Sequence, residues 1–437
     1  MTGLLSKYFD SIHRTQPWRW RGTVVESLAQ TVESSGPLAS VGECCEIVDR
    51  FGTAHAAEVI GFHGANVMSM PVETTEGIRF GDSVFSLGVR PEVGVGQDLV
   101  GRVLDAFGKP IDQGRSVAAT ERCSIDGSVR SPFERAPIRT PLGTGIRALD
   151  ALLTVGRGQR VGIFGGSGVG KSTLIGMMTR NTEADMTVVG LVGERGREVG
   201  EFLEDALGEE GRARSVVIVS TSDQSPLMRM RAALAATTVA EYFAAQGKHV
   251  LLVLDSLTRF AMAAREIGLA AGEPPTAKGY TPSVFTRLAK LIERAGNFRS
   301  GSITAFYTVL MEGDDQQDPL VDAVRSLLDG HIVLSRALAS EGWYPPVALL
   351  DSISRLMPAI VTPEQLQQAA LVRRMAAVFA RSEDLVRIGA YKSGSDPDMD
   401  RALRSRGALR EFLTQGASEQ VSFENTVARL AALTSGI

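Results

Sequence analysis

The chain has 437 residues, of which 44% are hydrophobic and 22% are charged, and its formal net charge at pH 7 is −4. This length is too great for a single hydrophobic core and predicts two or three domains, while the nearly balanced charge excludes a strongly basic nucleic-acid-binding protein. The sequence contains no run of 18 apolar residues and no signal peptide at its start. We therefore expect a soluble cytoplasmic protein with no specific nucleic-acid partner.

Residues 1–21 form a short polar segment that carries one apolar stripe. The apolar residues of the stripe recur at helical spacing: Leu4, Leu5, Tyr8, Phe9 and Ile12. A terminal helix with a single apolar face needs something to cover that face. From the residues alone, docking onto the same protein and binding of a partner explain the stripe equally well.

Residues 22–90 contain short β-rich runs separated by glycine, proline and polar turns. The clearest runs are 44–48, 58–62, 66–70 and 83–87. This spacing predicts a small β-barrel or sandwich without catalytic residues. The three cysteines, Cys44, Cys45 and Cys123, fit neither a disulfide framework nor a zinc-binding spacing.

Residues 91–361 alternate between apolar strands and amphipathic helices. Buried strands are expected at 159–164, 186–192, 215–219, 249–254 and 302–309. Such alternation is typical of an α/β domain built on a mainly parallel sheet. Residues 362–437 are helical in pattern and predict a compact C-terminal helical bundle.

A complete GxxxxGK[ST] phosphate-binding loop occupies residues 165–172, between an expected strand and an expected helix. The positions that would surround a nucleotide are Gly165, Gly166, Ser167, Gly168, Val169, Gly170, Lys171, Ser172 and Thr173. Glycines allow the backbone N–H groups to converge on phosphate, and the helix N-terminus adds its positive dipole end. Lys171 would reach the β- and γ-phosphates, and the Ser172 hydroxyl would ligate Mg²⁺. The chain is predicted to bind a nucleoside triphosphate.

Two carboxylates follow buried strands on the edge of the sheet that carries this loop. Asp255 ends the run Val-Leu-Leu-Val-Leu-Asp, where it can bind magnesium through water. Glu194 lies just past the carboxyl end of the strand expected at 186–192, where it can polarise a water in line with the γ-phosphate. We interpret Glu194 as the catalytic carboxylate and Glu198 as part of a solvated turn.

Charge that develops on the γ-phosphoryl group calls for a cation in the transition state. The candidates are Arg195, Arg259 and Arg355, and spacing alone does not choose among them. Tyr344, in Trp-Tyr-Pro-Pro, is an aromatic side chain that could stack on a base or pack in the core.

Four further segments fall in the positions expected for one known family. They are GRVLDAFGKPID at 101–112, PLGTGIRALD at 141–150, GERGRE at 193–198 and GDDQQDP at 313–319. Together with the phosphate loop they resemble the rotary ATPases, and most closely the ATPases of type III protein export of the flagellar kind. The match runs from about residue 24 to residue 433.

The resemblance implies a multidomain α/β protein with an N-terminal β-barrel, a central RecA-like P-loop domain and a C-terminal helical bundle. It implies that Glu194 activates water, that Arg195 and Arg259 hold the γ-phosphate side, and that Tyr344 stacks on adenine. Arg355 would act in trans on the nucleotide of a neighbour, within a ring that is expected to be a homohexamer. The implied cofactor is Mg²⁺.

The same resemblance implies partners. The N-terminal stripe would bind a stator-like negative regulator, and the ring would meet the export gate, a stalk protein and chaperone–cargo complexes. The expected location is the cytoplasm, with peripheral association with the inner membrane through the export apparatus.

Several alternatives remain at the level of sequence. Gly-Met-Met at 176–178 and Glu-Pro-Pro-x-x-Lys-Gly-Tyr at 273–280 favour the flagellar system over a virulence-type injection system. Tyr-x-x-Gly-x-Asp-Pro at 391–397 favours an export ATPase over a catalytic ATP synthase subunit. A Rho-like RNA translocase would need basic and aromatic residues in its barrel, and residues 23–90 have few of either. A protein that uses ATP only as a structural ligand would not need Glu194.

Overall fold

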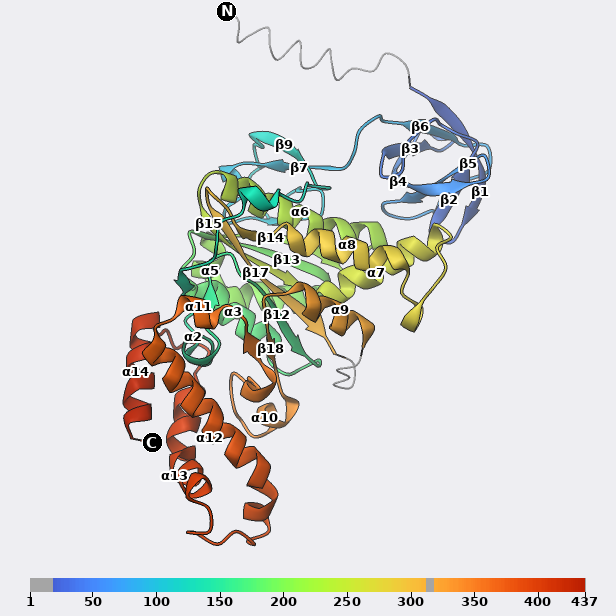
Figure 1. Cartoon of the computed structure of the whole chain (residues 1–437). Coiled ribbons are helices and arrows are strands. Elements are labelled where there is room, and N and C mark those ends of the chain that lie inside the picture. The colour runs from blue at the N-terminus through green and yellow to red at the C-terminus, as the bar shows by residue number, and fades with distance from the viewer. Residues whose placement is uncertain (1–18, 312–317, 437) are drawn as a thin grey trace, which may run out of the picture.

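The computed structural model describes residues 19–311 and 318–436 and has the expected fold class. A small β-barrel forms the N-terminal end, a sheet covered by helices forms the centre, and three helices form the C-terminal end (Figure 1). The apolar stripe of Leu4, Leu5, Tyr8, Phe9 and Ile12 lies outside the described residues. No helix of the described part is both long and apolar enough to cross a membrane.

Six antiparallel strands close the barrel in the order β1-β2-β5-β4-β3-β6. They are β1 (Arg21–Leu28), β2 (Thr31–Ser34), β3 (Cys44–Val48), β4 (Ala54–His63), β5 (Asn66–Pro71) and β6 (Ser83–Ser86). Buried and exposed residues alternate along these strands, so that Val24, Val32, Ile47, Val67 and Val84 fill the interior. Since the interior is packed with apolar side chains, the barrel is a structural unit.

The central sheet has the strand order β19-β18-β12-β17-β15-β13-β14-β8, with β16 paired to β17. Its strands are β8 (Val103–Leu104), β12 (Arg160–Gly165), β13 (Met186–Glu194), β14 (Ser215–Thr221), β15 (His249–Asp255), β16 (Gly296–Asn297), β17 (Ser302–Leu310), β18 (Gly330–Val333) and β19 (Ile353–Ser354). All neighbours are parallel except the pairs β16–β17 and β18–β19. Every buried strand expected from the sequence is present, and β13 and β15 end on the candidate carboxylates Glu194 and Asp255.

Helices cover both faces of this sheet, and consecutive strand residues therefore enter different cores. The helices are α2 (Arg147–Leu152), α3 (Lys171–Asn181), α4 (Gly196–Glu201), α5 (Gly208–Ala213), α6 (Pro226–Ala245), α7 (Leu257–Ala270), α8 (Pro282–Glu293), α9 (Pro319–Leu327), α10 (Arg336–Ser340) and α11 (Met357–Ile360). Val188 and Leu252 join the core beneath α6, α7 and α8, whereas Val189 and Val253 join the core beneath α2, α3 and the C-terminal helices. Burial on both faces is typical of parallel sheets and explains the continuous apolar runs.

Short elements connect the three parts. The strands β7 (Glu92–Val95) and β9 (Glu121–Ser124) pair with each other, as do β10 (Pro141–Leu142) and β11 (Val155–Gly156). A buried ion pair joins the barrel to the centre, because Arg231 of α6 donates to Glu58 of β4 at 2.8 Å. The barrel is therefore fixed on α6 by a charged contact as well as by apolar packing.

The C-terminal helices are α12 (Pro363–Arg387), α13 (Pro397–Leu413) and α14 (Phe423–Ser435). They pack against α2, where the buried Arg147 donates from Nε to the backbone oxygen of Phe412 at 2.9 Å. The backbone N–H of Gln415 donates to the backbone oxygen of Tyr344 at 2.7 Å. The segment just after α13 thus holds the segment that carries the candidate base-stacking tyrosine.

Candidate active site

The phosphate-binding loop connects the end of β12 to the start of α3. Gly168 and Gly170 have φ angles of 76° and 91°, a left-handed conformation that glycine adopts without steric cost. Lys171 is 8% exposed, and its Nζ donates to the backbone oxygens of Gly165 at 3.0 Å and Gly166 at 2.9 Å. The lysine therefore lies folded over the loop. Burial lowers its pKa, and the negative charges of the neighbouring carboxylates oppose that effect.

The loop positions named from the sequence lie together in the structure. Ser172 and Thr173 stand in the first turn of α3, where both residues are exposed and their hydroxyls are open to a ligand. Val169 is buried and packs into the core beneath the loop. The loop thus has an anchored apolar side and an open polar side.

Asp255 and Glu194 lie at the carboxyl ends of the neighbouring parallel strands β15 and β13. The side chain of Asp255 is buried, and the Thr308 hydroxyl of β17 donates to its Oδ1 at 2.5 Å. Burial raises the pKa of Asp255, while the hydrogen bond from Thr308 and the charge of Lys171 lower it. A carboxylate held in this way is fixed in orientation beside the loop lysine.

Arg259, in the first turn of α7, lies against Glu194. Its Nε is 3.2 Å from Oε1 of Glu194. Burial, the charge of Asp255 and the neighbouring Glu198 together raise the pKa of Glu194 to about 8, while Arg259 opposes the shift. Four of the predicted site residues, Lys171, Glu194, Asp255 and Arg259, thus form one cluster of interacting charges.

Tyr344 lies over the phosphate loop. A Cβ atom built on Gly170 would be 3.5 Å from Cε1 of Tyr344, so the ring edge is in contact distance of the loop. The tyrosine is 47% exposed. The ring therefore has a free surface next to the loop, as base stacking requires.

The structure places Arg195 apart from this cluster. Its side chain is 74% exposed, and its only ion pair in the described part of the chain is with Glu198 at 3.8 Å. Gly193, with a φ angle of 69°, interrupts the strand pattern just before Glu194. The turn directs Glu194 inward and leaves Arg195 in solvent.

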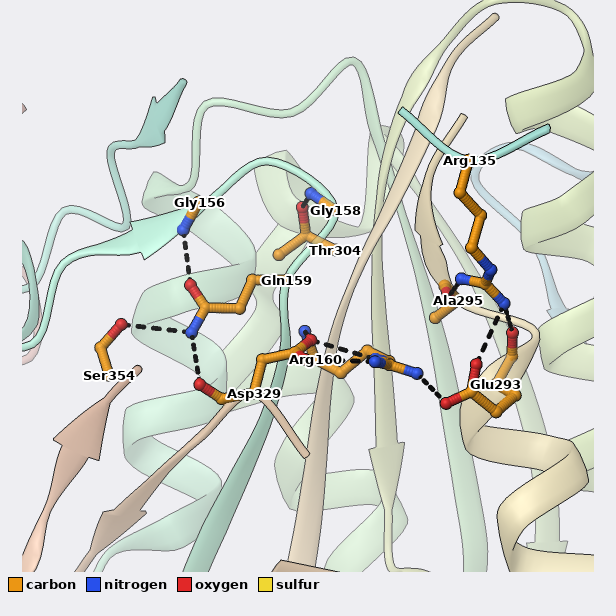
Figure 2. A network of polar contacts seen from close by, with 10 residues as sticks. All are labelled: Arg135, Gly156, Gly158, Gln159, Arg160, Glu293, Ala295, Thr304, Asp329 and Ser354. Atoms are coloured by element: carbon orange, nitrogen blue, oxygen red, sulfur yellow. Dashed lines mark hydrogen bonds and ion pairs between the residues drawn. The ribbon is translucent and has the colours of Figure 1, made fainter. Parts of the chain in front are cut away.

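Arg355 lies at the opposite edge of the sheet from its own phosphate loop. Its backbone N–H donates to the backbone oxygen of Asp329, whose own N–H donates to that of Arg160, each at 3.0 Å. Arg160 begins β12 and Gly165 ends it. At about 3.3 Å per residue, the five steps between them separate Arg355 from its own loop by roughly 16 Å along the strand. Figure 2 shows this end of the sheet, with Arg160, Asp329 and Ser354 side by side.

Sequence reasoning did not identify two residues that contact the cluster. Thr308 is a polar residue inside an apolar strand, and that exception was its only signal. Glu198, interpreted as part of a solvated turn, lies close enough to Glu194 to raise its pKa. Its position four residues after Glu194, at the start of α4, could have placed it next to that carboxylate.

A phosphate loop, two coupled carboxylates at the same sheet edge and a parallel sheet covered on both faces define a P-loop nucleoside triphosphatase. Residues 145–354 match the model of the ATP synthase alpha/beta family, nucleotide-binding domain, and residues 361–432 match the T3SS EscN ATPase C-terminal domain. The flagellum-specific ATP synthase of Treponema pallidum (strain Nichols) is 52% identical over 99% of this chain and 97% of that protein. The chain belongs to the flagellar and type III secretion ATPases of the ATP synthase α/β family and is an ATP-hydrolysing enzyme.

Relatives from secretion systems are similar to nearly the same extent. The type 3 secretion system ATPase of Sinorhizobium fredii (strain NBRC 101917 / NGR234) is 47% identical over 95% of this chain and 92% of that protein. Among solved structures, the assembled ATPase EscN in complex with its central stalk EscO, from enteropathogenic E. coli, has a TM-score of 0.87. It is 41% identical and covers 94% of this chain and 100% of that chain.

Proposed function

We propose that this chain hydrolyses ATP to energise protein export through a flagellar type III secretion apparatus, and that it works as a homohexameric ring. The observation that carries the proposal is the convergence of Lys171, Glu194 and Asp255 at one sheet edge. A protein that only stored ATP would have no use for a partly buried carboxylate whose pKa is raised to about 8.

Each residue of the cluster has a role in this reaction. Lys171 leaves the loop carbonyls for the β- and γ-phosphates, and the backbone N–H groups of 166–170 surround the β-phosphate. Glu194 accepts a proton from the attacking water, and Arg259 orients that carboxylate and faces the γ-phosphate side. Tyr344 stacks on the adenine ring beside Gly170. Arg195, exposed beside them, would contribute only after a rotation toward the nucleotide.

The residues at the loop fit a magnesium ion held largely by its substrate. The described residues contain no group of three or more histidine, cysteine or acidic side chains able to hold a metal alone. Mg²⁺ keeps several waters and binds through one or two protein ligands plus phosphate oxygens. The exposed Ser172 hydroxyl and, through water, Asp255 would supply those ligands. When bound, the ion neutralises charge on the β- and γ-phosphate oxygens.

Arg355 completes the site of the neighbouring subunit. Its position at the far end of β12 supports this role, because its backbone lies roughly 16 Å from the loop of its own subunit. An arginine donated in trans stabilises the charge of the transition state. One subunit would then carry the phosphate loop at one end of β12 and Arg355, the arginine finger, near the other. In a ring of subunits joined head to tail, each loop meets the finger of a neighbour.

The pH dependence of hydrolysis follows from Glu194. As a base it acts only when ionised, and its pKa of about 8 lies above its ordinary value, so kcat/KM for ATP should rise with pH through a midpoint near 8. Replacing Glu198 by alanine removes a hydrogen bond and a charge that raise this pKa, and should move the midpoint to lower pH. Rates measured between about pH 6 and pH 9 check both expectations. A flat profile, or an unchanged midpoint in Glu198→Ala, would contradict them.

The N-terminal stripe of Leu4, Leu5, Tyr8, Phe9 and Ile12 is proposed to bind a stator-like negative regulator. Deletion of residues 2–15 should abolish regulator binding in a pull-down and leave ATP affinity unchanged, because the loop lies far along the chain. Binding that survives the deletion would show that the regulator uses another surface. Further proposed partners are the stalk protein, the export gate and chaperone–cargo complexes, which would hold the ring at the inner membrane.

Motility separates the flagellar system from the injection system. A clean deletion of the gene should abolish swimming and flagellar filaments, and a copy with Lys171→Ala should not restore them, because the β- and γ-phosphates lose their cation. The wild-type copy is the control and should restore swimming. Normal motility together with lost secretion of injected proteins would assign the chain to the alternative system.

A further inference from the structure

We infer that Gln159 is a positioning residue for Arg355, because it clamps the two-residue strand β19, which directly precedes Arg355, against the start of β12. The inference rests on the proposed role of Arg355 in the neighbouring subunit's site. It assigns to a buried side chain at the far sheet edge a function in hydrolysis, exerted through another residue.

The strand that precedes Arg355 has few contacts of its own. It comprises only Ile353 and Ser354, and it pairs with β18 through two residues. The guanidinium of Arg355 has no ion pair among the residues that the structure describes, and its one polar contact is with the backbone oxygen of Arg325 at 3.5 Å. The placement of the finger therefore depends on what holds its backbone.

Gln159 supplies that hold. It is fully buried, and its Nε2 donates both to the Ser354 hydroxyl and to the backbone oxygen of Asp329, each at 3.2 Å. The same carbonyl accepts the backbone N–H of Arg355 at 3.0 Å. The Oε1 of Gln159 accepts from the backbone N–H of Gly156 at 2.8 Å, which fixes the orientation of the side-chain amide. All polar atoms of this side chain are thus used to join the finger strand to the segment before β12 (Figure 2).

Two further observations show how closely this clamp fits. The Ser354 hydroxyl, which accepts from Gln159, also donates to the backbone oxygen of Thr154 at 2.7 Å, so that β19 is tied to a second segment of the chain. A Cβ atom at Gly330 would lie 2.7 Å from the backbone oxygen of Ile353 and 3.2 Å from Nε2 of Gln159. Only glycine therefore lets β19 approach the clamp this closely.

An ion-pair network lies next to the clamp and shares Asp329 with it. Arg160 donates to the Asp329 carboxylate from Nε at 3.0 Å and from Nη2 at 3.1 Å. The Nη1 of Arg160 also contacts Glu293 of α8. Arg135 donates to Glu293 at 3.2 Å. Glu293 thus belongs to the same network but contacts neither β19 nor Arg355, which makes it the matched control.

The first test compares kinetics of three variants. Gln159→Met keeps the unbranched shape but removes the donating Nε2 and the accepting Oε1. Ser354→Ala removes one of the two acceptors of Nε2 with little change in volume. Since a displacement of about 1 Å at a catalytic group can cost roughly 100-fold in rate, we expect Gln159→Met to lower kcat by about 10- to 100-fold and Ser354→Ala by less. KM for ATP should change little, because each subunit's own loop is intact. Glu293→Gln should keep the wild-type kcat.

The second test asks in which subunit the damage acts. Gln159→Met subunits keep a sound loop and Glu194, while Glu194→Gln subunits keep a sound finger. The two variants are mixed as dilute proteins and then concentrated so that mixed rings form. Activity should return at interfaces where a Gln159→Met subunit supplies the loop and a Glu194→Gln subunit supplies Arg355. Random assembly makes such interfaces up to roughly a quarter of the total. A mixture of Arg355→Ala with Glu194→Gln serves as the reference.

The outcomes separate the inference from the function on which it rests. Recovery in both mixtures supports the positioning role, because a variant that merely disturbed its own fold would not be rescued by a neighbour. Recovery with Arg355→Ala but not with Gln159→Met overturns the inference and leaves the finger in place. Recovery in neither mixture overturns the trans action of Arg355 as well. A wild-type kcat in Gln159→Met, or an equal loss in Glu293→Gln, also overturns the inference.

Discussion

Replacement of Glu194 by glutamine should abolish ATP turnover while ATP still binds. Glutamine has nearly the same shape and can keep the contact with Arg259, but it cannot take a proton from water. General-base catalysis is typically worth about 10²- to 10⁴-fold in rate, so we expect kcat to fall by at least about 100-fold. Phosphate release measures turnover, and equilibrium binding of a fluorescent ATP analogue measures affinity.

The matched control for this variant is Glu201→Gln. Glu201 lies on α4, a few residues beyond Glu194, and forms an exposed ion pair with Arg197 at 3.4 Å. It should keep wild-type turnover, because exposed pairs of this kind contribute little. Unchanged phosphate release in Glu194→Gln would rule out the assignment of the base, and loss of binding would point to damage of the loop.

Replacement of Arg355 by alanine should cost about 10³-fold or more in kcat, the range known for an arginine supplied in trans. The wild-type enzyme should also gain specific activity as it is concentrated, since each site is complete only when a neighbour is present. In Arg355→Ala this gain should disappear, although the ring still forms. Phosphate release across a dilution series, with ring size followed by light scattering, checks both statements.

Arg122→Ala is the control for the loss of an arginine. Arg122 is exposed on β9, away from the central sheet edge that carries Arg355. Its replacement should leave kcat and the concentration dependence as they are in the wild type. Equal specific activity of dilute and concentrated wild-type enzyme would contradict the shared site.

Much of the fold and of the site could be predicted because the signals are local. An apolar run followed by a carboxylate placed Asp255 and Glu194 at strand ends, and parallel strands bring such ends to one edge of the sheet. The loop at 165–172 carries its own turn chemistry and needs no distant residue to define its course.

The remaining features depend on contacts between distant residues. Gln159 and Ser354 are 195 residues apart, and nothing in either segment indicates that they meet. The outward direction of Arg195 follows from the left-handed Gly193, which breaks the alternation that a strand pattern assumes. The packing of Tyr344 on Gly170 likewise requires the C-terminal helices to hold its segment in place.

The opposite placement of the loop and of Arg355 has a genetic consequence. Each subunit takes part in two active sites, one at the interface with each of its neighbours. A mutant gene copy therefore also inactivates sites that belong to wild-type subunits. In a cell that also carries a sound copy, an allele damaged at both edges, such as Lys171→Ala with Arg355→Ala, would silence sound subunits on one side as well as itself. Such an allele should be dominant, with motility falling faster than the share of faulty protein rises.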